Sequence, residues 1–312
     1  MKHAVAVIAG GLSLERDVSL RSGRRVAEAL EDLGHRVTLL DLDDQLVQAL
    51  AEGSFDVAFL ALHGKAGEDG TIQGLLDLLG IPYTGPDATA SALAWDKVVC
   101  KGLWSRSGLP TPSWVSLSSD AIRDMGAARV FDRIVDRLGL PLVVKPAQGG
   151  ASMGVRRVDR GEALPAALVA SYSYHDVVVI ERFVAGTEVA VSIIDGQALP
   201  AVEIVPKEGN YDYVARYTPG ATEFFVPARL DDAVLERCAD VALRAYEEIG
   251  CRRVTRADLL VDGEGTPWLL ELDTCPGMTE TSLLPMAAAA AGWDFPALCD
   301  RLVSNVLAAA DG

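Results

Sequence analysis

The segment from residue 255 to residue 273 combines two apolar runs with charged side chains at regular spacing. The sequence DGEG between the runs is typical of a tight turn. A turn centred on its last two residues pairs the charged side chains across the strands: Asp258 with Glu271, and Arg256 with Asp273. Because side chains alternate along a strand, all four share one face. The apolar residues of the other face are expected in the core: Ala257, Leu259, Leu270 and Leu272.

Three carboxylates on one face of a hairpin repel one another, because cross-strand Cβ atoms lie only about 5 Å apart. Such a face needs a counter-charge. Mg²⁺ prefers carboxylate oxygens and usually keeps substrate phosphates as its remaining ligands. The alternative is a solvated polar face on which Arg256 pairs with one acid. Exposed faces normally mix Lys, Thr and Ser, so the pattern favours a magnesium site at Asp258, Glu271 and Asp273.

The glycine-rich sequence VVKPAQGGASMGV, residues 143–155, places Lys145 at the end of an apolar strand. Glycines allow backbone N–H groups to close on phosphate oxygens, and a lysine adds a point charge. No Gly-Lys-Ser/Thr ends the segment, so it is not a Walker A loop, and its glycine spacing differs from a dinucleotide fingerprint. It is therefore a candidate phosphate-binding loop, and an ordinary flexible hairpin loop is the alternative.

Three single residues also have positions that suit a site. Lys97 in the helical sequence AWDKVVCK is a second candidate cation, although a lone helix lysine is more often solvated. Glu181 ends a very apolar strand, where it could accept from a ribose or an adenine or could be an edge carboxylate. His63 ends a strand beside a glycine, and a structural histidine is the alternative.

The elements that must position these residues follow two patterns. The first 95 residues alternate strands and helices, which predicts a parallel sheet with ligands beyond the carboxyl ends of its strands. The segments GGLSLERD and HGKAGEDG occupy those ends. The expected elements are strands at 4–8, 36–40, 57–62, 141–146 and 177–183, and helices at 18–33, 71–79, 87–107 and 231–249. After Gly186 the strands come in pairs, which indicates an α+β region.

Composition limits the function further. The chain has 312 residues, about half of them apolar, which allows two or three domains. Its net charge of −16 disfavours nucleic acid as a partner. Five cysteines without a CxxC pair indicate reduced thiols in a cytoplasmic protein. No apolar run approaches 18 residues and the N-terminus lacks a signal-peptide pattern, so we expect no membrane span.

Together the motifs resemble the ATP-grasp D-alanine:D-alanine ligases over essentially the whole chain. The matching sequences are GGLSLERDVS, ALHGKAGEDGTIQG, DK, KPxxGGxSxG, IER, YDYxxRY, RxDLL and ELDTxPGMTxxSL. The resemblance implies an α/β fold, α+β in its C-terminal part, with three domains. We expect a Rossmann-like substrate domain at 1–95, a central subdomain at 96–185 and a catalytic domain at 186–312, with ATP between the last two. A homodimer in the cytoplasm is also implied.

The resemblance assigns a role to each motif residue. Groups toward ATP are Lys97, Lys145, Ser152, Glu181, Glu188 and Arg216, and two Mg²⁺ ions are expected at Asp258, Glu271 and Asp273. Glu15 matches the residue that receives the first substrate's ammonium, with His63 nearby. Ser282 and Leu283 match the cradle of the second substrate's carboxylate. Arg256 and the Gly277 N–H match the groups that stabilise the tetrahedral intermediate, and Tyr217 lies on the closing loop.

Three positions depart from the family's usual pattern. Ala151 replaces a serine that links the first-substrate glutamate to the lid tyrosine, Asp273 replaces an asparagine, and Arg216 replaces a lysine. These changes favour a specialised relative such as D-cycloserine synthetase, which closes a ring within O-ureido-D-serine for antibiotic biosynthesis. The retained cradle at Ser282 and Leu283 favours the alternative, an ordinary ligase of peptidoglycan synthesis. A non-catalytic ATP-binding relative is disfavoured, because every phosphate and metal position is filled.

Overall fold

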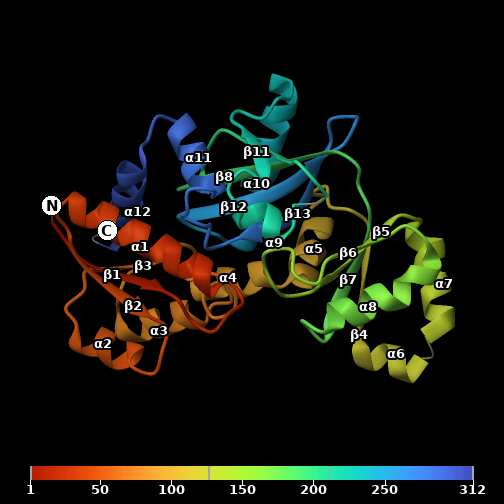
Figure 1. Cartoon of the computed structure of the whole chain (residues 1–312), viewed down its shortest axis with the longest axis horizontal. Coiled ribbons are helices and arrows are strands. Elements are labelled where there is room, and N and C mark those ends of the chain that lie inside the picture. The colour runs from red at the N-terminus through yellow and green to blue at the C-terminus, as the bar shows by residue number, and fades with distance from the viewer. Residues whose placement is uncertain (1, 126, 210, 311–312) are drawn as a thin grey trace.

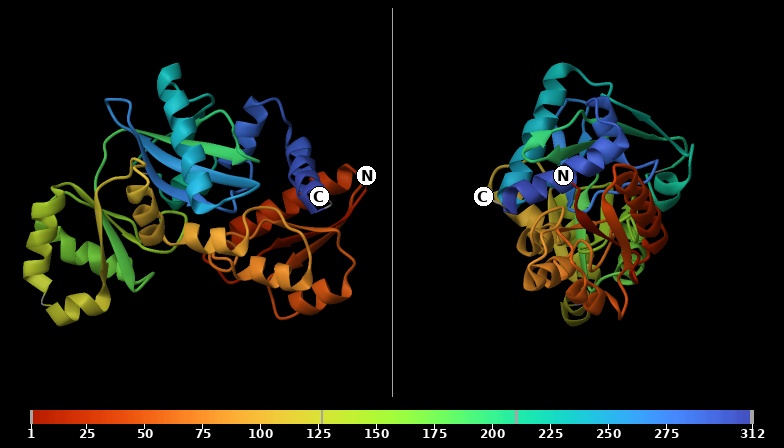
Figure 2. Two further views of the ribbon diagram at one scale, coloured as in Figure 1. Left: turned by 180° about the vertical axis from the view of Figure 1, so that it is seen from behind. Right: turned by 90° about the vertical axis from the view of Figure 1, so that its left-hand side faces the viewer.

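The computed structural model describes residues 2–125, 127–209 and 211–310 and builds them on three β-sheets (Figure 1). Figure 2 shows the six-stranded sheet between the other two, with the N-terminal sheet at one end of the long axis and the four-stranded sheet at the other. The parallel N-terminal sheet and the antiparallel later sheets confirm the predicted fold class. The domain boundaries at residues 95 and 185 stay predictions.

The N-terminal sheet has the strand order β2-β1-β3, and both pairs are parallel. Its elements are β1 (Ala4–Ala9), α1 (Arg16–Asp32), β2 (Arg36–Asp41), α2 (Leu46–Glu52), β3 (Val57–Leu60) and α3 (Thr71–Leu79). All six residues of β1 are buried, as a central strand of aliphatic residues requires. The loops after β1 and β3 meet at the predicted sheet edge, where the Ser13 hydroxyl donates to the His63 carbonyl at 2.8 Å.

The predicted helix at 87–107 is wrong in one respect, because it is two helices. They are α4 (Ala88–Trp95) and α5 (Lys97–Arg106). Asp96 between them has an extended backbone, and its carboxylate accepts from the N–H groups of Val98 and Val99. An aspartate in this position satisfies the free N–H groups of a new helix. The break places Lys97 on the first turn of α5, beside the glycine-rich loop.

The four-stranded sheet is antiparallel, in the order β4-β7-β5-β6. Its elements are β4 (Trp114–Ser118), α6 (Ser119–Met125), α7 (Ala127–Leu138), β5 (Leu142–Pro146), β6 (Arg156–Val158), α8 (Leu164–Tyr172) and β7 (Val177–Arg182), with a 3-10 turn at Gly161–Ala163. The glycine-rich segment is the connection between β5 and β6. The sheet therefore presents that loop and the end of β7 toward the middle of the molecule (Figure 1).

The six-stranded sheet has the path β11-β10-β8-β12-β13, with β9 beside β8. Its strands are β8 (Thr187–Ile194), β9 (Gln197–Ala198), β10 (Val202–Pro206), β11 (Thr222–Phe225), β12 (Val254–Val261) and β13 (Pro267–Asp273), and the helices of this part are α9 (Tyr213–Tyr217), α10 (Asp232–Ile249), α11 (Leu283–Ala290) and α12 (Phe295–Ala310). One face packs on α10, α4 and α5. The other shares a core with α11, α12 and the N-terminal sheet.

The β12–β13 hairpin has the predicted register where the charged residues lie. Arg256 pairs with Asp273, and Asp258 pairs with Glu271. Beyond Asp258 a bulge shifts the register by one residue, so that Leu269 opposes Leu259 and is fully buried. Leu270, expected in the core, instead lines a cavity. The prediction for Leu270 is wrong because a bulge moves a side chain to the other face.

Two further sequence expectations concern the cysteines and membrane-spanning segments. All five cysteines are buried and unpaired, as expected for thiols. Among the described residues, no helix has the length and apolar character needed to cross a membrane.

The break at Asp96 gives a first testable prediction. Asp96→Ala should lower the free energy of unfolding by about 1 kcal/mol, because α5 loses its N-terminal acceptor. Asp96→Asn keeps a side-chain oxygen and should cost less. Urea unfolding of the two variants checks this, and an Asp96→Ala protein as stable as the wild type would show that the break does not depend on the cap.

Candidate active site

Two open cavities adjoin at the centre of the molecule. Both are lined by Lys97, Gly149, Gly150, Arg216 and Glu271. We call the first the substrate cavity and the second the nucleotide cavity, after the roles that the resemblance predicts for Glu15 and Lys145, which line them. The predicted site residues from all three sheets thus come together.

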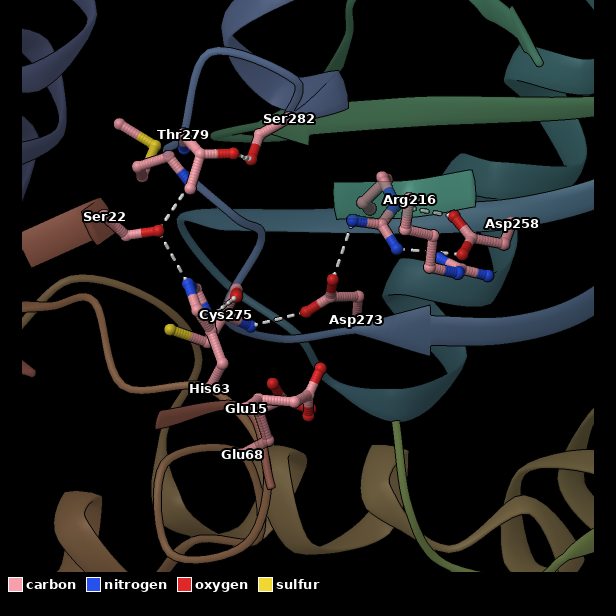
Figure 3. A network of polar contacts seen from close by, with 12 residues as sticks. Glu15, Ser22, His63, Glu68, Arg216, Asp258, Asp273, Cys275, Thr279 and Ser282 are labelled. Carbon is pink, nitrogen blue, oxygen red and sulfur yellow. Dashed lines mark hydrogen bonds and ion pairs between the residues drawn. The ribbon is translucent and has the colours of Figure 1, made fainter. Parts of the chain in front are cut away.

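The acidic face of the hairpin carries a buried arginine. Arg256 forms a bidentate pair with Asp258, at 2.6 and 2.9 Å, and its third nitrogen lies 2.8 Å from Asp273. Figure 3 shows these acids and the lid residue Arg216 around the same space. The positive charge of Arg256 offsets the repulsion that three carboxylates on one face would otherwise produce. The sequence prediction of the shared face is therefore confirmed.

The donor set of this face suits Mg²⁺ only with help from a ligand. In the part of the chain that the structure describes, no three acidic, histidine or cysteine side chains are grouped to hold a metal ion by themselves. Mg²⁺ is commonly bound by one or two carboxylates, with substrate phosphates and water completing its shell. Asp258, Glu271 and Asp273 supply such hard oxygens beside a phosphate-binding loop, so these residues fit the ion together with a nucleotide.

Glu271 is ionised and surrounded by cations. Lys97 Nζ lies 3.3 Å from its carboxylate and donates to the Gly149 carbonyl at 2.7 Å. Burial alone would raise the pKa of Glu271, but the charges of Lys97, Arg216, Lys145 and Arg256 outweigh burial and hold its pKa at about 2. Lys97 thereby connects the acidic face to the glycine-rich loop.

The two nitrogens that hold Glu181 belong to two lysines. Lys145 and Lys101 each lie 2.7 Å from one carboxylate oxygen, and Glu181 is only 3% exposed. Burial raises the pKa of Glu181, but the two lysines more than compensate and lower it. The sequence reasoning missed Lys101. Its signal is the four-residue spacing from Lys97, which puts both lysines on one side of α5. A role of Glu181 toward adenine or ribose stays a prediction.

The glycine-rich loop and α9 meet over the nucleotide cavity. Ala151 and Ser152 have φ angles of 48° and 57°, a conformation that helps backbone N–H groups to form an anion-binding concavity. Arg216 donates to the Ser152 hydroxyl at 3.1 Å, and its guanidinium lies 4.2 Å over the Tyr211 ring. Glu188 lines the same cavity, and burial raises its pKa to about 7. The lid arginine is therefore fixed by its planar stacking as well as by charge.

Glu15 contacts the lid directly. The Tyr217 hydroxyl donates to Glu15 Oε1 at 3.3 Å, and Glu15 is 4% exposed. Ala151 supplies no hydroxyl between these two residues, as its side chain implies, but they contact each other directly without one. Burial and then the charge of Asp273 raise the pKa of Glu15 to about 7, although the Tyr217 hydrogen bond lowers it.

Glu68 is a site residue that the sequence reasoning missed, although it lies in the segment HGKAGEDG. It accepts from the Gly64 N–H at 2.8 Å and lines the substrate cavity beside Glu15 (Figure 3). Burial first, then the charges of Asp273 and Glu15, raise its pKa well above the usual range. Glu15 and Glu68, whose pKa values are both raised by burial and by the charge of Asp273, create a site for a cation, and an ammonium group fits it.

His63 is buried and neutral. Its Nδ1 lies 3.0 Å from the Cys275 carbonyl and its Nε2 lies 2.9 Å from the Ser22 hydroxyl. A carbonyl can only accept, so Nδ1 carries the proton and Nε2 accepts from Ser22. Burial lowers the pKa of His63 to about 4. His63 therefore lines the substrate cavity without offering a charge to it.

The predicted cradle for the second substrate lies at the start of α11. The Ser282 hydroxyl accepts from the Thr279 N–H at 2.9 Å and lies 2.8 Å from the Thr279 hydroxyl. A Cβ on Gly277 would come within 2.6 Å of the Ser282 hydroxyl, so a larger residue here would have to displace that hydroxyl. Gly277, Ser282 and Leu283 all line the substrate cavity.

Comparison with known proteins agrees with this geometry. The model of the D-ala D-ala ligase C-terminus matches residues 103–304, and that of the D-ala D-ala ligase N-terminus matches residues 42–86. The chain is 46% identical over 302 residues to a D-alanine–D-alanine ligase of Magnetococcus marinus, covering 96% of each, and 44% identical to one of Desulforudis audaxviator, covering 97% and 98%. The Bacillus anthracis D-alanine–D-alanine ligase, also solved with ATP, has a TM-score of 0.86, 36% identity and 98% coverage of both chains.

The fold and the site define an ATP-grasp ligase, an ADP-forming enzyme that joins a carboxylate to an amine. The chain belongs to the D-alanine–D-alanine ligase family. The relatives' names give no support to D-cycloserine synthesis or antibiotic biosynthesis, which the departures at Ala151, Asp273 and Arg216 had favoured.

Burial of His63 predicts a pH-dependent stability. In the unfolded chain a histidine binds a proton below about pH 6.5, whereas folded His63 stays neutral down to about pH 4. The unfolded state therefore gains protons first, and stability falls as the pH drops through this window. Between pH 6.5 and 4 the wild type should lose about 3 kcal/mol more than His63→Gln. If the unfolding free energies of the two proteins change equally with pH, His63 is not buried in its neutral form.

Proposed function

We propose that this enzyme joins two D-alanine molecules with ATP and Mg²⁺, as an ordinary D-alanine:D-alanine ligase of peptidoglycan synthesis. The observation that carries the proposal is the direct Tyr217–Glu15 hydrogen bond, because it removes the main argument for a changed substrate at Ala151. The names of the relatives support the same substrate. The cradle at Ser282 serves a second substrate, which a one-substrate cyclase would not need.

The first step is attack of a D-alanine carboxylate on the γ-phosphate of ATP. Charge on the transferred group must be spread over neighbouring cations. Lys97 and Lys145 both line the nucleotide cavity, and we assign this role to them. Asp258, Glu271 and Asp273 would hold two Mg²⁺ ions, which neutralise phosphate charge when bound.

The first substrate's ammonium would enter the carboxylate group of Glu15 and Glu68. Its positive charge relieves the repulsion between the two carboxylates and lowers the pKa of each. Binding of a cation is therefore favoured over binding of a neutral group. The acyl phosphate that forms hydrolyses readily, so the lid must exclude water. Tyr217, which lines the substrate cavity, contacts Glu15 directly and would take part in this lid.

The second step is attack of the second D-alanine's amine on the acyl carbon, which expels phosphate. The oxygen of the tetrahedral intermediate needs donors placed in advance. We assign them to Arg256 and to the backbone N–H of Gly277, both of which line the substrate cavity. The N-terminal end of α11 at Ser282 and Leu283 would receive the second carboxylate. The homodimer and the cytoplasmic location stay predictions.

The substrate proposal predicts magnesium-dependent synthesis of D-alanyl-D-alanine, with one ADP per dipeptide. A panel of D-alanine, D-serine and O-ureido-D-serine, assayed for ADP and for product, decides between the readings. We expect kcat/KM to be highest for D-alanine. A preference for O-ureido-D-serine with ring closure would establish the specialised reading, and no ADP from any of them would exclude a ligase of D-amino acids.

The metal proposal predicts loss of turnover in Asp258→Asn and Glu271→Gln with the fold intact. Arg256→Ala should leave metal binding in place and raise the barrier by about 3 to 4 kcal/mol, as for one lost oxyanion donor. Glu264→Gln is the matched control, since Glu264 is exposed in the turn of the same hairpin. Near wild-type turnover of either carboxylate variant at saturating Mg²⁺ would exclude the assigned ligands.

A further inference from the structure

The loop between β13 and α11 is bound by side chains of helix α1, which is about 250 residues away in the sequence. This loop, residues 274–282, carries Gly277 and ends at Ser282. Its centre is Met278, which is 1% exposed and belongs to the core shared with the N-terminal sheet. Two side chains of α1 bind the two backbone polar groups of Met278, so neither group is free to turn.

The first of these side chains is Ser22, which is fully buried. Its hydroxyl oxygen accepts from the Met278 N–H at 3.2 Å, while its proton goes to His63 Nε2 at 2.9 Å. The opposite nitrogen of His63 donates to the Cys275 carbonyl at 3.0 Å. Figure 3 shows this chain from Ser22 through His63 to Cys275. One hydrogen-bond direction satisfies all three contacts, since each donor has an acceptor.

The second side chain is Arg25, three residues further on the same face of α1. Its Nη1 donates to the Met278 carbonyl at 2.8 Å. The guanidinium also lies 3.6 Å over the Phe295 ring and 3.7 Å from Glu280, which fix its orientation. Ser22 and Arg25 therefore bind the N–H and the carbonyl of Met278, respectively.

We propose that Ser22, His63 and Arg25 form a clamp that positions the Gly277 N–H and the start of α11 for the second step of the reaction. The three bound backbone groups flank Gly277 on both sides, at Cys275 and Met278. Gly277 has no side chain of its own with which to hold its peptide. Its direction is thus set by the groups that the clamp binds.

The clamp should affect only the second step of the reaction, the attack of the amine on the acyl phosphate. Phosphorylation of the first carboxylate uses the nucleotide cavity, whereas amine attack uses Gly277 and Ser282. A loosened loop should therefore leave acyl phosphate formation intact and slow its capture. Uncaptured acyl phosphate reacts with water, which breaks its bond to phosphate and returns D-alanine and inorganic phosphate. The inference rests on the proposed function, because it assigns positioning residues to that reaction.

The experiment compares phosphate release with dipeptide formation in the same sample, using D-alanine, ATP and Mg²⁺. Arg25→Met keeps the side-chain stem on Phe295 but removes the donor, and Ser22→Ala removes the acceptor for Met278. Arg25→Lys keeps a donor, and Arg24→Ala is the matched control, because Arg24 is exposed on the same helix.

We expect one phosphate per dipeptide in the wild type, in Arg24→Ala and in Arg25→Lys. In Arg25→Met and Ser22→Ala, dipeptide formation should fall about 10- to 100-fold, the scale for a misplaced catalytic group. Phosphate should then exceed dipeptide, while KM for ATP stays unchanged. If the ratio stays at one and dipeptide formation keeps its wild-type rate in Arg25→Met, the clamp is overturned.

Two outcomes separate the clamp from the proposed function. A wild type that releases no phosphate with D-alanine refutes the proposed function alone. Amide hydrogen exchange over residues 277–280 then decides about the clamp, since Arg25→Met should speed exchange there and Arg24→Ala should not. Unchanged exchange in Arg25→Met overturns the clamp whatever the substrate is. Should Ser22→Ala fail to fold, Arg25→Met still carries both measurements.

Discussion

The concentration of negative charge around two adjoining cavities is the constraint on which the rest of the structure depends. Asp258, Glu271 and Asp273 share one face of a hairpin that borders both cavities, and Glu15 and Glu68 approach the substrate cavity from the N-terminal sheet. Such groups cannot all be ionised and close together without cations. The chain as a whole carries a charge of −16, so the cations had to be placed locally.

Each cation reaches the site from a different element. Lys97 comes from the first turn of α5, Lys145 from the end of β5, Arg216 from α9 and Arg256 from β12 itself. Their attraction to the acids brings the three sheets and the lid to a common centre. The pKa of Glu271, held at about 2 by these charges against the effect of burial, expresses that attraction most clearly. Substrate, nucleotide and metal then add further charges to this arrangement.

Local sequence was enough to predict the hairpin face, because alternation along a strand and a recognisable turn determine it. The predicted pairing of Asp258 with Glu271 is confirmed although a bulge lies next to it. The one-residue shift affects only the pairs between the bulge and the turn. The same bulge made Leu270 unpredictable. The division between α4 and α5 was missed because Asp96 lies in an otherwise helical pattern, and only its cap geometry reveals the break.

Other site residues could not be predicted because their partners are distant in sequence. From the sequence alone Lys101 resembles a surface lysine, because its partner Glu181 lies on β7, far away in the sequence. Arg25 lies 253 residues from Met278, and no local pattern on α1 indicates that contact. Burial and long-range pairing decide the roles of such residues, whereas the family motifs were recognisable from the sequence alone.

The central claim is that the acidic hairpin face binds divalent cations together with a nucleotide. A crystal structure with ADP and Mn²⁺, recorded at the manganese edge, tests it most directly. We predict anomalous peaks about 2 Å from oxygens of Asp258, Glu271 or Asp273 and of the nucleotide, as expected for Mg²⁺-type sites. Arg256 should then have released at least one Asp258 oxygen. Manganese bound elsewhere, with Arg256 still bidentate on Asp258, would contradict the account.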